Sequence, residues 1–240
     1  MRSPRFIVIV GTGTGVGKTV LSSLLTRRFV ELGGLRCVAL KPLCSGGRSD
    51  ARFLRRAAGD VLPLDTVNPW HFREPLAPAI AARRAGREVR AEDVVGSIRG
   101  VAKQGFDLVV VEGAGGLLSP LAEDLDARDL IRRLRATPVI VGANRLGALN
   151  EIFLTWDALP RAVRNRTTVV VMEPRRTDLA SRTNLPELRE RLGDGCVVSF
   201  PFLAEWENTL ANPLPPGLRR PLDALIAKIT DRASGPSTPR

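Results

Sequence analysis

Tyrosine is absent from this 240-residue sequence, histidine occurs once and cysteine only three times. The cysteines, at positions 37, 44 and 196, are an odd number without metal-ligand spacing, which indicates reduced thiols and excludes a disulfide framework. No apolar run approaches the roughly 18 residues that cross a bilayer, and the N-terminus has no signal-peptide pattern. These absences predict a cytoplasmic protein with no membrane partner.

Lysine is also scarce, with four residues against 32 arginines, although the net charge is +11. A basic chain is a candidate for nucleic-acid binding, but here the arginines are scattered, aromatic residues make up only 5%, and no recognised nucleic-acid motif occurs. We therefore attribute the charge to an arginine-rich composition and expect no nucleic-acid partner. Two of the four lysines, Lys18 and Lys41, follow predicted strands, where a compact ammonium group can act as a guanidinium cannot.

The distribution of apolar residues predicts an α/β fold. Short buried-strand patterns alternate with helical patterns, which is typical of a parallel central β-sheet flanked by helices. The length and the 44% apolar content favour a single globular domain over residues 1–232, followed by a disordered tail at 233–240. The many Pro, Asp and Asn residues between positions 59 and 78 predict a long functional loop over residues 59–78. Strands are predicted at 6–10, 37–40, 107–112, 138–141, 167–172 and 196–199, and helices at 18–32, 51–58, 78–85, 91–103, 126–135, 147–159, 186–192 and 222–231.

A glycine-rich turn between the first strand and the first helix carries the most specific chemical signal. Gly-Lys-Thr at 17–19 is the end of a P-loop, whose backbone N–H groups and helix dipole bind phosphate. The usual pattern places four residues between its first glycine and Gly-Lys-Thr. Here the nearest preceding glycine, Gly11, is separated from Gly-Lys-Thr by five residues. In this P-loop NTPase fold, Lys18 is expected to contact the β- and γ-phosphates of ATP and Thr19 to bind Mg²⁺.

Further polar residues follow the predicted strands at the same edge of the sheet, where ligands of parallel sheets bind. Glu112 ends the clearest central strand and is a candidate metal-directed carboxylate. Asp50 is either a plain helix N-cap or a further oxygen ligand near the metal. Lys41 is either a surface charge or, held by the Pro-x-x-Ser-Gly turn after it, a catalytic group aimed into the site. The hydroxyls of Thr14 and Ser45 are placed to orient a polar substrate.

Two other features of the sequence bear on the choice of nucleotide and of catalytic group. The sequence Asn-Arg-Leu-Gly at 144–147 lacks the Asn-Lys-x-Asp that selects guanine, so it gives no support to GTP. His71, the only histidine, lies among Pro and aromatic residues and is better explained by loop packing than by general-base chemistry.

Taken in order, these motifs resemble the dethiobiotin synthase family of P-loop enzymes over roughly residues 6–210. Its lengthened P-loop is matched at 11–19 and its Lys-Pro-x-x-Ser-Gly turn at 41–46. Its Ser-Asp-Ala is matched at 49–51 and its Asn-Pro…Glu-Pro…Pro loop at 68–78. The most specific match is Val-Glu-Gly-Ala-Gly-Gly at 111–116, followed by Leu-Gly-x-x-Asn at 146–150 and Pro-Phe-Leu at 201–203.

The resemblance implies ATP-dependent carboxylation of 7,8-diaminononanoate by CO₂ and closure of a ureido ring. It implies catalytic roles for Lys18 and Lys41, and a homodimer whose subunits share the substrate site. Metal ligands would be Thr19, Asp50 and Glu112. The nucleotide would contact Gly13, Thr14, Gly15, Val16, Gly17, Lys18, Thr19, Val20, Glu112, Pro201, Phe202 and Leu203, and the substrate would contact Thr14, Lys41, Ser45, Gly147, Ala148 and Asn150.

The chain departs from the family pattern in two places. Gly13 and Gly15 replace an Asp and a Glu of the P-loop, and Met172-Glu173-Pro174 stands where the family has an adenine-binding Asn. Three alternatives remain beside the ligase: an amide-forming enzyme of the cobyrinic acid a,c-diamide type, a partition-type switch ATPase, and, because of Gly13 and Gly15, a degenerate paralogue that binds nucleotide without turnover. The first usually carries a glutaminase domain, for which this chain is too short. The second usually carries an extra P-loop lysine, which is absent here.

Overall fold

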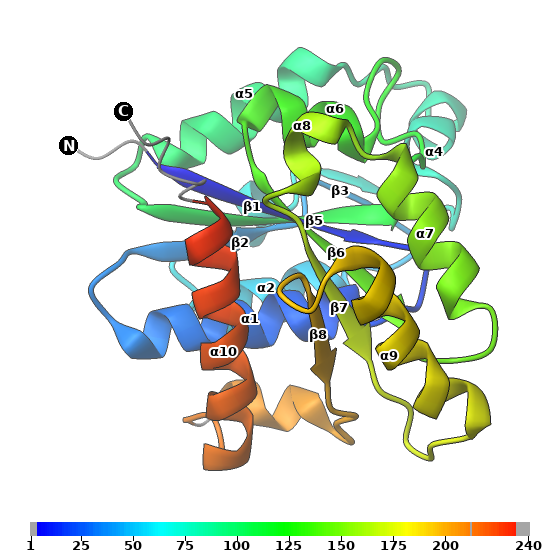
Figure 1. The fold of residues 1–240 in the computed structure, drawn as a ribbon. Helices are drawn as coiled ribbons and strands as arrows, with labels where there is room; N and C mark the ends of the chain where they lie inside the picture. Colours follow the sequence, from blue (N-terminus) through cyan, green and yellow to red (C-terminus); the bar gives the residue numbers. More distant parts are fainter. Residues whose placement is uncertain (1–3, 212, 234–240) are drawn as a thin grey trace, which may run out of the picture.

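The central feature of the molecule is a parallel six-stranded sheet with the order β2-β5-β1-β6-β7-β8. The computed structural model describes residues 4–211 and 213–233, and the α/β class predicted from the sequence is confirmed (Figure 1). The strands are β1 (Arg5–Gly11), β2 (Cys37–Leu40), β5 (Leu108–Gly116), β6 (Thr137–Ala143), β7 (Thr168–Met172) and β8 (Val197–Phe200).

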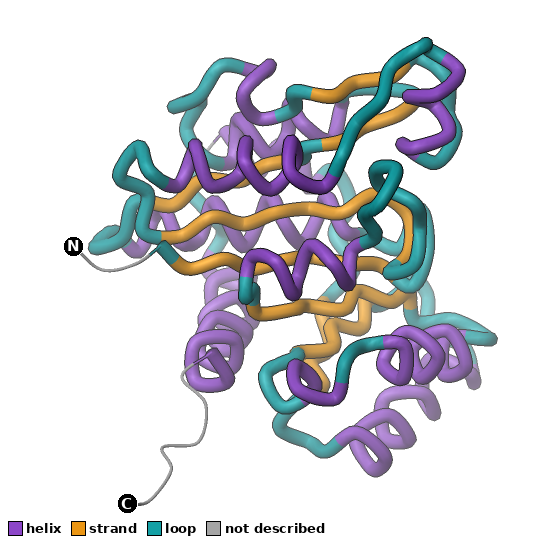
Figure 2. Tube along the Cα trace, turned by 90° about the horizontal axis from the view of Figure 1, so that it is seen from above, coloured by secondary structure: helices purple, strands orange, loops and turns teal. Residues whose placement is uncertain are grey.

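Strand composition explains the layering. Val109, Val110 and Val111 of β5 are completely inaccessible to solvent, as are Val8 and Ile9 of the neighbouring β1. Strands that are apolar on both faces require a helical layer on each side. Helices α1, α2 and α10 cover one face of the sheet and α5, α6 and α7 cover the other (Figures 1 and 2). Their bounds are α1 (Lys18–Leu32), α2 (Ser49–Ala57), α5 (Ala91–Ala102), α6 (Ala127–Leu134), α7 (Ala148–Ala158) and α10 (Pro216–Ala233).

The prediction of an irregular loop over residues 59–78 is wrong in part. The segment contains the short helix α3 (Leu64–Val67) and the strand β4 (Trp70–Phe72), which pairs in parallel with β3 (Leu43–Ser45) as a second, two-stranded sheet. The turn after Lys41 is therefore fixed by strand pairing as well as by its proline. Helix α4 (Pro78–Arg84) begins where the segment ends.

Several predicted boundaries also differ from the structure. Ser49 and Asp50 lie inside the first turn of α2, and Arg48 is its N-cap, so the predicted cap before residue 51 is wrong. Strand β5 continues through the glycines to Gly116 because its partner β1 still pairs there, Gly11 with Gly116. Helix α9 (Leu179–Leu192) starts seven residues before Pro186, the predicted start, because Asp178 caps it.

The remaining elements are the short helix α8 (Arg161–Arg164) and the 3₁₀ helix η1 (Trp206–Ala211). Helix α10 starts at Pro216 and not at the predicted residue 222. The predicted disordered tail falls on residues outside those described, apart from Ala233, which ends α10. The single domain over residues 1–232 stays a prediction. Among the described helices, none combines the length and apolarity that a membrane span requires.

Candidate active site

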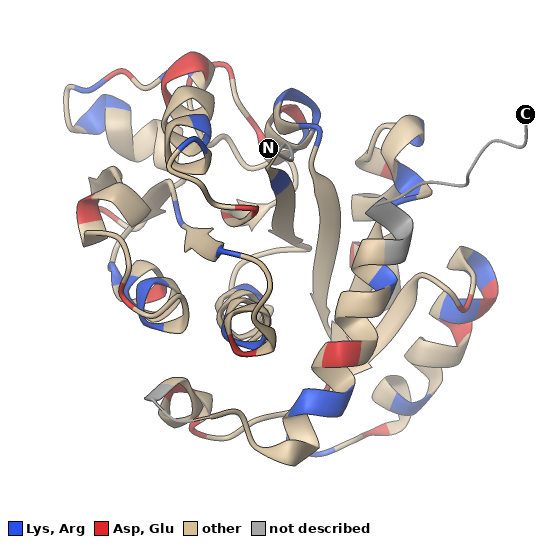
Figure 3. Ribbon diagram, turned by 90° about the vertical axis from the view of Figure 1, so that its left-hand side faces the viewer, with Lys and Arg blue, Asp and Glu red and all other residues tan. Residues whose placement is uncertain are grey.

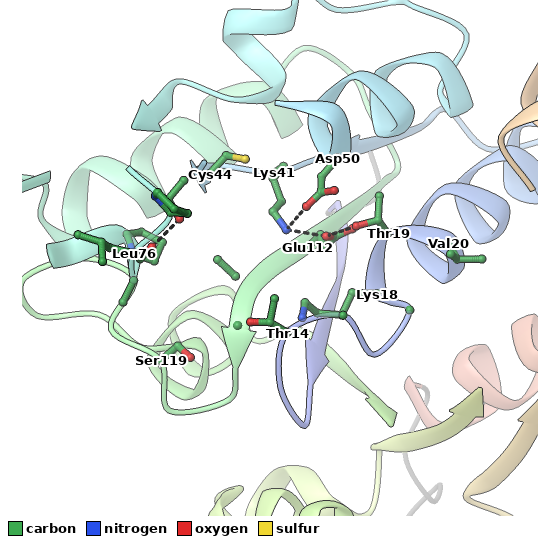
Figure 4. Close-up of a pocket in the computed structure, with 18 residues that line it drawn as sticks. Thr14, Lys18, Thr19, Val20, Lys41, Cys44, Asp50, Leu76, Glu112 and Ser119 are labelled. Carbon is green, nitrogen blue, oxygen red and sulfur yellow. Dashed lines mark hydrogen bonds and ion pairs between the residues drawn. The ribbon is translucent and has the colours of Figure 1, made fainter. Parts of the chain in front are cut away.

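A cavity of about 820 Å³ lies at the carboxyl ends of β1, β2 and β5. Its size is that of sites that hold cofactors or small molecules. The P-loop forms one wall, the turn after Lys41 a second, and the start of α4 a third (Figure 4). The lining residues are Thr14, Gly15, Gly17, Lys18, Thr19, Val20, Lys41, Cys44, Ser45, Asp50, Pro75, Leu76, Ala77, Pro78, Glu112, Ala114, Gly115 and Ser119.

Three glycines of the P-loop have backbone geometry that favours glycine. Gly15 and Gly17 have φ angles of 75° and 99°, which side chains other than glycine rarely adopt. A Cβ at Gly11 would lie 2.6 Å from the Gly13 carbonyl oxygen and 2.8 Å from Lys18 Nζ, so the loop closes tightly over its first glycine. This contact gives a physical reason for counting the loop from Gly11. Gly13 has an ordinary φ and open space around its Cβ position.

Lys18 is buried, and its Nζ donates to the Gly13 carbonyl oxygen at 2.6 Å. Burial, together with the charge of the nearby Lys41, lowers the pKa of Lys18 to about 8, although Glu112 and Asp50 act in the opposite direction. A lysine whose positive charge is insufficiently compensated favours an incoming anion, because the anion restores its lost solvation. The P-loop therefore has both the shape and the charge of a phosphate site.

Lys41 lies at the centre of a buried ion cluster. Its Nζ donates to Glu112 Oε1 at 2.6 Å and to the Gly113 carbonyl oxygen at 3.0 Å, and lies 3.2 Å from Asp50 Oδ2. The side chains of Lys41 and Glu112 are 5% and 0% exposed, whereas that of Asp50 is 39% exposed. Although burial opposes it, the two carboxylates raise the pKa of Lys41. Lys41 is therefore a charged group in the cavity and not a surface lysine.

Glu112 connects this cluster to the P-loop. The hydroxyl of Thr19 donates to Glu112 Oε1 at 2.9 Å, while Glu112 Oε2 is buried and has no hydrogen-bond partner among the residues that the structure describes. A threonine hydroxyl, an unpartnered carboxylate oxygen and the nearby Asp50 are oxygen donors of the kind that Mg²⁺ accepts, with phosphate and water completing its shell. No group of three or more His, Cys, Asp and Glu side chains within 4–211 and 213–233 could hold a metal, and a Mg²⁺–phosphate site does not require one.

A residue that the sequence interpretation missed holds the Lys41 turn. Asn68 is 1% exposed, and its Nδ2 donates to the carbonyl oxygen of Lys41 at 2.7 Å. Arg48 donates in turn to Asn68 Oδ1 at 3.0 Å. The Asn-Pro dipeptide was a signal for this role, since Asn side chains commonly bond to nearby backbone.

The two candidate substrate hydroxyls both line the cavity, Thr14 on the P-loop wall and Ser45 on the wall formed by the turn after Lys41. Thr14 is exposed at the tip of the P-loop, and Ser45 Oγ donates to the Leu76 carbonyl oxygen at 2.5 Å. Ser119, which the sequence interpretation also missed, accepts from the Gly116 backbone N–H at 2.9 Å and lines the cavity beside Thr14. Cys44, residues 75–78, Ala114 and Gly115 were not singled out as site residues either.

Several other predicted site residues lie outside this cavity. Val16 is buried beneath the P-loop, and residues 201–203 follow the end of β8. Gly147, Ala148 and Asn150 lie at the N-terminus of α7, and Gly147 has a φ of 91°. A groove of about 510 Å³, which Gly13 lines, runs from Thr14 and Ser119 to Leu154 of α7. The groove thus connects the α7 surface with the main cavity.

The end of β7 carries a polar network in place of the expected Asn. Glu173 accepts from Asn144 Nδ2 at 2.8 Å and from Ser199 Oγ at 2.6 Å. The Met172 side chain lies against the P-loop, since a Cβ added to Gly17 would be 3.0 Å from it. Glu173 is therefore held by protein donors at the edge of the nucleotide region.

Lysine and arginine residues are distributed over several elements, with aspartate and glutamate residues among them (Figure 3). The single histidine, His71, pairs in β4 with Cys44 of β3 and does not line the cavity.

Comparison with known proteins gives one family. The family model described as an AAA domain matches residues 5–207. An ATP-dependent dethiobiotin synthetase from Anaeromyxobacter dehalogenans is 44% identical over 65% of this chain and 71% of its own length. One from Rhodococcus jostii is 40% identical over 81% and 85%, and one from Marinobacter nauticus is 32% identical over 90% and 94%.

Solved structures with the same fold include a plasmid partition protein from Borrelia burgdorferi bound to AMPPNP. It has a TM-score of 0.59 and 10% identity, and the match covers 96% of this chain and all of that one. The receptor FtsY from Elizabethkingia anophelis in complex with GDP has a TM-score of 0.55 and 16% identity, over 93% of this chain and 64% of that one. At these identities the likeness shows the P-loop NTPase fold alone.

Proposed function

Because the chain belongs to the family of ATP-dependent dethiobiotin synthetases, which are ligases of biotin biosynthesis, we propose that it closes the ureido ring of dethiobiotin. The substrates would be 7,8-diaminononanoate, CO₂ and ATP. The observation that carries the proposal is the position of Lys41. A buried lysine, held by Glu112 and Asp50, lines the same cavity as the P-loop lysine and gives the site a second cationic centre beside the phosphate position.

The proposed reaction has three steps. One amine of the substrate attacks the carbon of CO₂ and loses a proton, which gives a carbamate. A carbamate oxygen then attacks the γ-phosphorus of ATP, ADP leaves, and a carbamic-phosphoric anhydride results. The second amine attacks the carbonyl carbon and loses a proton, the bond from that carbon to the bridging oxygen breaks, and phosphate leaves as the ring closes.

Particular residues of this chain would have a role in each step. Lys18 and the P-loop N–H groups would bind the β- and γ-phosphates and stabilise charge that grows during phosphoryl transfer. Lys41 would hold the carbamate against the γ-phosphorus, which is a proximity effect. Thr14 and Ser45 would orient the diamine from two walls of the cavity. Thr19, Asp50 and Glu112 would hold Mg²⁺, which when bound would neutralise phosphate charge.

We further infer a homodimer with a shared substrate site. Leu118 and Leu154, which line the groove beside Thr14, are 53% and 63% exposed, and Leu146 just before α7 is 82% exposed. Exposed apolar residues that cluster around a groove are typical of interfaces. In a two-fold dimer through this face, the α7 N-terminus of one subunit, with Gly147, Ala148 and Asn150, would face the other subunit's groove. Its backbone N–H groups would suit the substrate carboxylate.

Steady-state phosphate release from ATP tests the function, measured with bicarbonate and with or without 7,8-diaminononanoate. We expect release that depends on the diamine and yields one dethiobiotin per phosphate. Lys18→Gln should abolish turnover, whereas Lys41→Gln should impair use of the diamine more than binding of ATP. Diamine-independent hydrolysis would favour a switch ATPase, and ATP binding without any turnover would favour the non-catalytic paralogue that Gly13 and Gly15 suggest.

A further inference from the structure

A second cavity, of about 300 Å³, lies at the opposite end of the sheet from the P-loop. It is formed where β1, β5 and β6 begin and where α1 and α10 end, and Figure 1 shows the last turns of α10 approaching the start of β1. It shares no lining residue with the cavity around Lys18. A ligand here would therefore bind independently of ATP and of the proposed substrates.

The walls of this lower cavity are largely apolar. Phe29, Leu134 and Ile229 line it and are 3%, 4% and 1% exposed, and Phe6 completes the aromatic side. The volume is at the lower end of the range for small-molecule sites.

Three arginines, Arg5, Arg135 and Arg166, also line the lower cavity. In the described part of the chain none of them forms an ion pair with a carboxylate, whereas Arg28 on α1 is paired with Asp223 at 2.7 Å. Arg166 Nη1 reaches only a backbone oxygen, that of Arg135, at 3.5 Å.

The Arg166 guanidinium is the most informative of the three. Its Nε atom is shielded from solvent and has no hydrogen-bond partner among the described residues. Burial lowers its pKa, which is the mark of a cation without a counter-charge. A guanidinium presents a planar fork of N–H donors that matches a carboxylate in two-point contact. The group that would satisfy it is a carboxylate placed between the arginines.

We propose that the lower cavity is a binding site for a small monocarboxylic acid with an apolar body. The carboxylate would contact Arg166, with Arg5 and Arg135 beside it, and the apolar body would lie against Phe6, Phe29 and Ile229. A carboxylate fits better than a phosphate ester, because the apolar walls favour a ligand with one charge and an uncharged remainder. A ligand bound there touches β1, α6 and α10 together and stabilises the folded chain by mass action.

The test uses nonanoate as the probe, below its micelle-forming concentration, with 1-nonanol and nonylamine as neutral and cationic comparisons of the same chain length. Isothermal titration and thermal unfolding of the full chain give affinity and stabilisation. Arg166→Met keeps the apolar stem of the side chain and removes its charge. Arg161→Met is the matched control, since Arg161 is exposed on the neighbouring α8 and does not line the cavity. Arg135→Asn is a second variant, because Asn tolerates the positive φ of position 135.

We expect saturable binding of nonanoate by the wild type and by Arg161→Met, with about tenfold weaker binding by Arg166→Met and Arg135→Asn, as for the loss of a charge-assisted hydrogen bond. Nonanol and nonylamine should bind at least about tenfold less tightly than nonanoate. ATP should not displace the probe. Equal binding by wild type and both cavity variants, displacement by ATP, or no binding would overturn the proposal. So would binding seen only after removal of residues 234–240, since the chain's own end would then occupy the space.

Discussion

Replacing Lys41 by Met removes one partner of a buried ion pair and leaves the other behind. Glu112 has a fully buried side chain, and Lys41 Nζ lies 2.6 Å from its Oε1 atom. The Thr19 hydroxyl would still donate to that oxygen, but the buried negative charge would have no cationic partner at that distance. Breaking a buried pair in this way typically costs about 3–5 kcal/mol of unfolding free energy.

The loss of the contact between Lys41 and the second carboxylate, Asp50, changes this cost only slightly. Asp50 is 3.2 Å from Lys41 Nζ, but its side chain is 39% exposed, so water can replace the lysine there. We therefore expect Lys41→Met to lower the unfolding free energy by about 3–5 kcal/mol. Replacing both partners, as in Lys41→Met with Glu112→Gln, should be less damaging than the sum of the single changes by about 1–3 kcal/mol.

Urea unfolding of the nucleotide-free protein, followed by far-ultraviolet circular dichroism, measures these values. Lys103→Met is the matched control, because Lys103 is exposed at the end of α5 and should change stability by less than about 0.5 kcal/mol. Strictly additive single and double variants, or a Lys41→Met protein as stable as the control, would refute the idea that Lys41 and Glu112 form one buried unit.

Three further predictions concern other parts of the site. Because the native pKa of Lys18 is about 8 and that of an unfolded lysine about 10.5, the unfolded chain binds the extra proton between these values. Wild-type stability should therefore rise relative to Lys18→Met by about 2 kcal/mol from pH 7.5 to 9.5 in urea titrations, and an unchanged difference would contradict the pKa assignment. Leu154→Glu should give a monomer that binds ATP but does not use the diamine, as judged by light scattering and turnover. Leu179→Glu should remain dimeric, because Leu179 is also exposed but lies on α9 and does not line the groove. Gly13→Asp should leave the melting temperature nearly unchanged, whereas Gly15→Glu should lower stability by about 1–2 kcal/mol because φ is positive there; equal effects would show that the loop geometry is wrong.

The sequence predicted most of the sheet because its strands are buried on both faces. Continuous apolar runs such as Val109–Val111 are typical of strands in the interior of a parallel sheet. The positions of these strands along the chain could therefore be predicted. The glycine-rich turn and Lys18 were equally clear, since Gly-Lys-Thr between a strand and a helix is a local signal, and Gly15 and Gly17 have the positive φ angles that favour glycine. Both features depend on local rules.

What the sequence did not reveal depends on contacts between distant segments. The pairing of β3 with β4 joins residues 43–45 to residues 70–72, and no periodicity marks such short strands. The support of the Lys41 turn by Asn68 and Arg48 is likewise a tertiary contact. Helix α9 begins before Pro186 because the Asp178 cap stabilises its start. Helix propensities alone do not predict that this cap outweighs the proline.

The origin of the oxygen atoms in the released phosphate shows whether a carbamate is phosphorylated in this site. If the carbamate oxygen attacks the γ-phosphorus, phosphate released from unlabelled ATP in the presence of the diamine and ¹⁸O-labelled CO₂ must carry one oxygen from CO₂. Mass spectrometry at times short compared with exchange of CO₂ with water would detect it. We expect singly labelled phosphate together with labelled dethiobiotin. Unlabelled phosphate would contradict phosphorylation of a carbamate in this site.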